Sequence, residues 1–165
     1  MGLNLEALKP VLDGAGSASL SCSGRRSEAY RLVFVPSSNR PSHVVTVAAG
    51  DGFWEADAVE LALLTYSRQY SPQRRHGPRR LPNGEIDVLR RALERASYWT
   101  VEPIDNRDFY DGNIIAIEAR TDAGYRVVLR RSPRDGPFVR TAFLFFELAG
   151  LPYPEGEPLP WEWFR

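Results

Sequence analysis

Short runs of apolar residues in the first half of the chain are typical of β-strands. Residues 30–35 (YRLVFV) and 43–49 (HVVTVAA) are rich in β-branched and aromatic side chains, which fit a pleated, half-buried surface. The Gly-Asp-Gly sequence at 50–52 predicts a tight turn, because glycine accepts positive φ angles. Residues 53–66 have the Ala, Glu and Leu content of a helix, but the preceding turn favours a returning strand. We therefore predict a third strand over 53–66.

Two further strands are predicted at 114–120 and 125–131, and the position of charged residues indicates their register. A three-residue loop over 122–124, with Gly124 in the left-handed region, places Thr121 opposite Tyr125. One face of this hairpin then holds uncharged residues, namely Ile115, Ile117, Ala119, Tyr125, Val127 and Leu129. The other face holds Glu118, Arg120, Arg126 and Arg130. A four-residue loop would bring Arg126 and Arg130 beside Ile115 and Ile117, so burial favours the first register.

Helical periodicity is clearest in two segments. Residues 85–97 follow a possible cap at Asn83 and form one apolar face from Ile86, Leu89, Leu93 and Ala96. Residues 138–149 are apolar around most of a helix and end at Gly150, which predicts a buried helix with a glycine C-cap. A shorter helix is predicted over 3–12, where Pro10 disturbs the spacing of three leucines.

The segments between these elements are polar or rich in Gly and Pro. Within 13–27, only Leu20 and Cys22 suggest an edge strand, and 67–82 is predicted to be a polar loop. The pattern as a whole predicts one α+β domain over 1–165. It consists of an antiparallel sheet of about five strands with two principal helices packed on one face. Residues 1–27 are expected to be a weakly ordered segment, and 152–165 an aromatic, Pro-rich strap.

Composition excludes several classes of function. Acidic and basic residues balance at 21 each, so no overall field attracts nucleic acid or an anionic membrane. Cys22 is the only cysteine, which excludes an internal disulfide and a multi-thiolate metal site. The N-terminus lacks the pattern of a signal peptide, and the longest apolar runs are too short to cross a bilayer. We expect a cytoplasmic protein without membrane partners.

Two charged clusters are candidate binding sites. The carboxylates Asp105, Asp108 and Asp111 do not have the spacing of a calcium loop, because Arg107 and Phe109 occupy ligand positions. A solvated acidic loop is the better interpretation. The basic cluster contains Arg68, Arg74, Arg75, His76, Arg79 and Arg80. A solvated loop is again favoured, an acidic protein partner is the second interpretation, and nucleic acid is unlikely because no nucleic-acid-binding signature accompanies the cluster.

Catalytic candidates are few. His43 and His76 are the only histidines, and no nucleophile elbow, zinc motif, phosphate loop or dinucleotide motif is present. Cys22 lacks a neighbouring base, and the predicted register sends the possible acid–base pair of Glu118 and Tyr125 to opposite faces. We therefore predict no catalytic, metal or cofactor site.

The aromatic tail has two interpretations. Aromatic anchors dominate binding hot spots, but they pack equally well as a strap on the protein's own core. The strap is favoured for some of Tyr153, Trp161, Trp163 and Phe164, and contact with a partner stays open for Trp161 and Trp163.

A set of short motifs runs in a fixed order from residue 28 to residue 151, namely Tyr30-Arg31-Leu32, Arg40-Pro41, Trp99, Asp111-Gly112, Ile117-Glu118, Tyr125 to Arg130 with Pro133, and Leu148 to Leu151. As an ordered set, these motifs resemble a family of bacterial proteins that is similar to toxin-immunity proteins. The resembled proteins are small antitoxins encoded beside secreted toxins, including type VI secretion effectors. The resemblance implies a non-enzymatic, cytoplasmic immunity protein that binds a cognate toxin.

The expected contact residues come from the charged clusters, the polar face of the predicted hairpin and the tail. They are Arg74, Arg75, Asp105, Asp108, Asp111, Glu118, Arg120, Arg126, Arg130, Trp161 and Trp163. Two alternatives remain: a nucleic-acid accessory protein acting through 68–80, and an enzyme of unrecognised type with a pocket that gathers Glu118, Arg126, Arg130 and His43.

Overall fold

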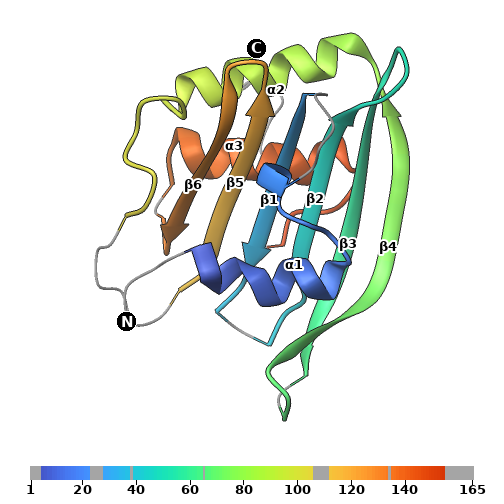
Figure 1. The fold of residues 1–165 in the computed structure, drawn as a ribbon, viewed down its shortest axis with the longest axis vertical. Helices are drawn as coiled ribbons and strands as arrows, with labels where there is room; N and C mark the ends of the chain where they lie inside the picture. Colours follow the sequence, from blue (N-terminus) through green and yellow to red (C-terminus); the bar gives the residue numbers. More distant parts are fainter. Residues whose placement is uncertain are drawn as a thin grey trace.

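The computed structural model describes residues 5–22, 28–37, 39–64, 66–105, 112–133 and 135–154. Within them, one antiparallel sheet of six strands has the order β4-β3-β2-β1-β5-β6 (Figure 1). The strands are β1 (Ala29–Val35), β2 (Ser42–Ala49), β3 (Trp54–Leu64), β4 (Gln69–Leu81), β5 (Ile114–Thr121) and β6 (Gly124–Arg131). The helices are α1 (Lys9–Ala15), α2 (Asn83–Arg95) and α3 (Pro137–Leu148), with 3-10 turns η1 (Leu5–Leu8) and η2 (Leu20–Cys22). The predicted α+β class is confirmed, with six strands instead of about five. The shorter helix predicted over 3–12 corresponds to η1 and α1, which together span 5–15.

Helices cover both faces of the sheet. Figure 1 shows α2 and α3 behind the sheet and α1 in front of it. The larger core lies between one face of the sheet and helices α2 and α3. A smaller core lies between the opposite face, with Val33, Val44 and Val59, and helix α1. The central strand β1 is therefore buried on both sides, which explains why its sequence is a continuous apolar run. The two predicted principal helices do share a face; α1 closes the other.

The prediction of a polar loop over 67–82 is wrong, because β4 occupies most of it as an edge strand. An edge strand tolerates proline, since its outer N–H groups need no partner in the sheet. The arginines of β4 alternate between the faces and meet helix C-termini on both. Arg75 donates to the Ala15 carbonyl at the end of α1 (3.1 Å), and Arg79 donates to the Leu148 carbonyl at the end of α3 (2.9 Å). Cations are favourable at these negative helix ends.

The predicted register of the β5–β6 hairpin is also wrong. Arg120 lies opposite Tyr125 and Thr121 opposite Gly124, so Arg126 and Arg130 do share a face with Ile115 and Ile117. Neither arginine is fully buried by this arrangement, because β6 is an edge strand and its arginines extend past the core. Arg126 donates to the carbonyl oxygens of Tyr98 (2.8 Å) and Val101, and Arg130 to those of Glu102 (2.6 Å) and Pro103 (3.2 Å).

Smaller corrections concern the ends of elements. The edge strand suggested by Leu20 and Cys22 is the 3-10 turn η2. Asn83 is the first residue of α2 and does not cap it by a side-chain hydrogen bond. The helix α3 ends as predicted, with Gly150 at φ 71° and the Leu151 N–H bonded to the Phe146 carbonyl (2.8 Å). This glycine closes the last turn of the helix.

The described part of the C-terminal strap packs on α3. The ring centroids of Tyr153 and Phe143 are 5.7 Å apart, and the Tyr153 hydroxyl donates a hydrogen bond of 2.8 Å to the Glu147 carboxylate. Trp161, Trp163 and Phe164 lie outside the described residues.

None of the described helices combines the length and the apolar character that crossing a bilayer requires.

Candidate functional site

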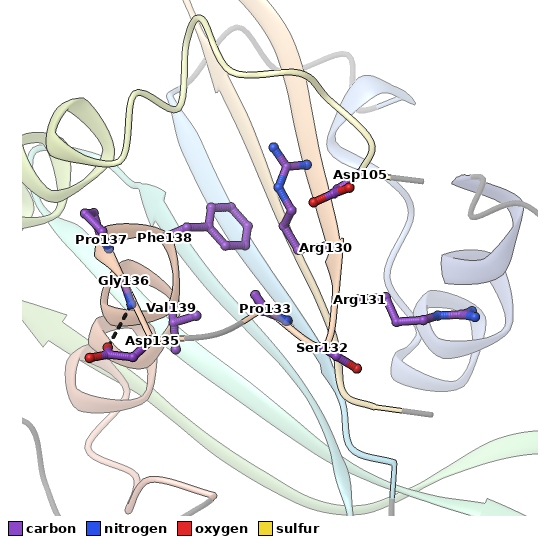
Figure 2. A pocket seen from close by; sticks show the side chains of 10 residues that line it. All are labelled: Asp105, Arg130, Arg131, Ser132, Pro133, Asp135, Gly136, Pro137, Phe138 and Val139. Atoms are coloured by element: carbon purple, nitrogen blue, oxygen red, sulfur yellow. Dashed lines mark hydrogen bonds between the residues drawn. The ribbon is translucent and has the colours of Figure 1, made fainter. Parts of the chain in front are cut away.

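A pocket of about 450 Å³ lies where the end of β6 meets the start of α3 (Figure 2). Its volume is within the range of about 300–1,000 Å³ that is common for small-ligand pockets. Asp105 and Arg130 both line it, and the Arg130 guanidinium lies 5.6 Å from the centroid of the Phe138 ring. The Asp105 N–H donates to the Leu129 carbonyl (3.3 Å), so the segment before it follows the outer edge of β6.

The charges of this pocket are engaged by the protein itself. The Asp135 carboxylate accepts a hydrogen bond of 2.8 Å from the Gly136 N–H at the start of α3 and pairs with Arg140 (3.2 Å). This hydrogen bonding with Arg140 holds the pKa of Asp135 below its usual value. The positive end of the α3 dipole thus already faces a carboxylate, and Arg130 is held by backbone carbonyl groups. Among the described residues that line it, two acidic and two basic side chains balance one another.

The acidic candidates do not form a metal site within the described residues. Asp105 lines the pocket, whereas Asp108 and Asp111 lie outside the part of the chain that the structure describes. Across the described ranges, no three His, Cys, Asp or Glu side chains gather in a way that could hold a metal ion.

The corrected hairpin register creates a buried polar cluster on the α1 side of the sheet. The Glu118 carboxylate, 1% exposed, accepts hydrogen bonds from Ser19 (2.7 Å) and Tyr125 (2.8 Å) and pairs with Arg31 (3.3 Å). Arg31, 6% exposed, also donates to the Ala18 carbonyl (2.6 Å) and to Thr46 (3.3 Å). A buried charge of this kind is tolerated only when it is paired and hydrogen-bonded.

This polar cluster holds the chain rather than offering a reactive group. Burial, together with the adjacent Glu118 carboxylate, raises the pKa of Tyr125 well above its ordinary value, so this phenol stays protonated near neutral pH and donates to Glu118. Arg120 donates to the Leu20 carbonyl (3.1 Å). Together with Arg31, it fastens residues 17–22 to the sheet. The predicted contact residues Glu118 and Arg120 therefore have roles within the fold.

Neither a family model, nor a curated protein, nor a solved structure matches this chain.

A pair of histidines lies on the other face of the sheet, between β2 and β4. His43 packs edge-on against Phe146, with 5.1 Å between ring centroids, and lies opposite Glu60. His76 Nε2 is 3.7 Å from Glu60, within reach of an ion pair but too far for a hydrogen bond. His43 Nδ1 and His76 Nε2 are buried without a hydrogen-bond partner among the described residues. The enzyme-type pocket of Glu118 with His43 is not formed, because the two lie on opposite faces.

The His43 environment predicts a loss of stability at acidic pH. Burial lowers the pKa of His43 in the folded state below 6.5, while the unfolded chain takes up this proton near pH 6.5. The unfolded state therefore binds more protons as the pH falls through this range, and the stabilisation that the neutral imidazole gives at pH 7.5 is progressively lost.

The measurement compares the free energy of unfolding of the wild type with that of His43→Gln at pH 7.5 and pH 5. We expect the wild type to lose more stability than the variant on acidification. Equal losses in the wild type and His43→Gln would contradict this assignment.

The most exposed apolar side chains lie at the tip of the β3–β4 hairpin. Leu63 is 54% exposed, Leu64 is 46% exposed and Tyr66 is fully exposed; these are three of the five large hydrophobic residues that are exposed in the described part of the chain. The sequence does not point to this tip, because 53–66 is predicted as a strand of the sheet while its hairpin partner, 67–82, is predicted as a loop. The available signal was the run Leu61 to Leu64, whose consecutive apolar residues do not all fit one buried face of a strand.

Proposed function

We propose that this protein is a non-enzymatic binding module of the cytoplasm, and that it acts as an immunity protein that neutralises a cognate toxin by direct contact. The exposed apolar tip formed by Leu63, Leu64 and Tyr66 carries this proposal. Single exposed apolar residues are ordinary on a protein surface, but a cluster of them marks an interaction site.

The internal contacts of the other candidates support the same proposal. Glu118, Arg120, Arg126 and Arg130 each bond to other parts of the chain, and Arg75 bonds to the end of α1. These groups stabilise the scaffold, which leaves recognition to the exposed surface. The resemblance to immunity proteins supplies the class of partner, a toxin or effector protein.

The proposal predicts a complex with a toxin encoded beside this protein. The two proteins are co-expressed and purified through a tag on the toxin, and the survival of cells that express the toxin is measured with and without this protein. We expect co-purification and protection, and no protection from an unrelated toxin. Absence of both a complex and protection would contradict the proposed function.

A further inference from the structure

The β3–β4 hairpin extends beyond the rest of the sheet. Ser42, the first residue of β2, lies opposite Leu61, so Ala62, Leu63 and Leu64 pair only with β4. Figure 1 shows this two-stranded extension projecting past the ends of the other strands. An isolated two-stranded ribbon has little hydrophobic support of its own. Tyr70 packs on the core beneath α1, whereas Leu63 and Leu64 stay exposed and would be buried only by another molecule.

Helix α1 holds the extension in a fixed direction. Gly14 of α1 packs so closely on β4 that a Cβ atom there would lie 2.6 Å from both the Cβ and the carbonyl oxygen of Tyr70. Beside this contact, α1 and the hairpin enclose a groove of about 640 Å³, whose lining includes Glu6, Lys9 and Arg68. A binding element that is already oriented loses less conformational entropy when its partner binds.

The charge along the hairpin is positive although the whole chain is neutral. Residues 61–80 contain five arginines and no acidic residue. Arg75 and Arg79 bond to helix ends, whereas Arg68 and Arg74 are exposed. Opposite charge on the partner would accelerate association and orient the complex. The surface therefore fits an acidic partner.

Side chains, rather than the backbone edge of β4, are suited to make this contact. Pro72 and Pro78 lack the N–H groups that an added strand would need, and arginines line the same edge. Both features discourage strand addition.

A protein fits this surface better than a nucleic acid does. Leu63 and Leu64 offer aliphatic surface that phosphates and bases would not bury well, and the carboxylates of Glu6 and Asp13 line the groove beside the hairpin. A polyanion would meet those carboxylates directly.

We infer that the hairpin tip inserts Leu63, Leu64 and Tyr66 into an apolar pocket on the partner protein, and that acidic residues at the rim of that pocket face Arg68 and Arg74. This inference rests on the proposed function and names the surface through which it acts. A few anchors of this kind commonly supply most of the binding energy of an interface.

The test measures binding of the neighbouring toxin to variants of the full chain whose circular dichroism and thermal melting match the wild type. The tip variant combines Leu63→Ser, Leu64→Ser and Tyr66→Ser, and the charge variant combines Arg68→Glu and Arg74→Glu. Matched controls are Trp99→Ala, which removes another exposed aromatic residue, and Arg91→Glu, which reverses an exposed charge on α2.

We expect the tip variant to bind at least about 100-fold more weakly and the charge variant about 10-fold or more, mainly through slower association at low salt. The controls should bind like the wild type. If the wild type binds and both variants bind equally well, the inferred surface is wrong while the proposed function stands. If the wild type binds no neighbouring protein, the proposed function fails, and the inference fails with it.

Two further outcomes would overturn the inference by assigning the hairpin to another partner. A salt-dependent gel shift of DNA or RNA that is lost in the charge variant but kept in the tip variant would assign it to nucleic acid. Dimerisation of the wild type in sedimentation experiments that disappears in the tip variant would assign it to a second copy of this chain.

Discussion

Replacing Arg31 with leucine is expected to destabilise the protein by about 3–5 kcal/mol, the usual effect of removing one partner from a buried ion pair. Glu118 would keep its hydrogen bonds from Ser19 and Tyr125 but lose the only cation that pairs with it among the described residues. At 1% exposure, water cannot replace that cation. The free energy of unfolding in urea, extrapolated to water, measures the effect.

The double variant Arg31→Leu/Glu118→Leu separates the cost of an unpaired charge from the net contribution of the pair. A buried pair contributes little net stability relative to apolar residues of similar size, so the double variant should be more stable than Arg31→Leu alone. A loss below about 1 kcal/mol in the single variant would place this pair with exposed ion pairs and would contradict the structural role of the cluster.

The location of this cluster depends on one register, which shows where prediction from the sequence stops. The sequence indicates two strands and a helix correctly, from the β-branched runs at 30–35 and 43–49 and the apolar periodicity at 85–97. In each of these segments, the apolar residues that form the pattern are also the residues that the fold buries. The β5–β6 register depended instead on whether Arg126 and Arg130 could avoid the core. They can, since β6 is an edge strand whose arginines reach carbonyl groups of 98–103. The position of a strand in the sheet is not part of its local pattern.

The same limit explains β4 and the hairpin tip. A segment with two prolines and five basic residues has the composition of a solvated loop, but proline and arginine are also the residues that protect an exposed sheet edge. Composition cannot distinguish the two cases. Pairing with the apolar strand β3 decides between them, and the turn that joins the two strands brings Arg68 next to Leu64, whose carbonyl accepts a hydrogen bond of 2.9 Å from the Arg68 N–H. The proposed binding surface therefore became visible only in three dimensions.

Replacing Gly112 with alanine is expected to destabilise the protein by about 2–4 kcal/mol, because backbone strain and overpacking act together. Gly112 has φ 143°, and a Cβ atom there would lie 1.3 Å from Ser132 Oγ and 2.5 Å from Ser132 Cβ. The chain cannot easily withdraw, since the Ser132 N–H donates to the Asn113 carbonyl at 2.7 Å. Chemical denaturation measures the change.

Gly84→Ala is the matched control, since it makes the same substitution where nothing lies within 4 Å of the new Cβ atom. Gly84 is in the first turn of α2, so alanine should stabilise the protein there by about 0.4–1 kcal/mol. The double variant Gly112→Ala/Ser132→Gly removes the collision but keeps the φ angle. If the collision is the larger cost, the double variant should lose less stability than the two single variants lose in sum, because the effects of residues in contact are not additive. Additive losses would instead assign the cost to the backbone angle of Gly112.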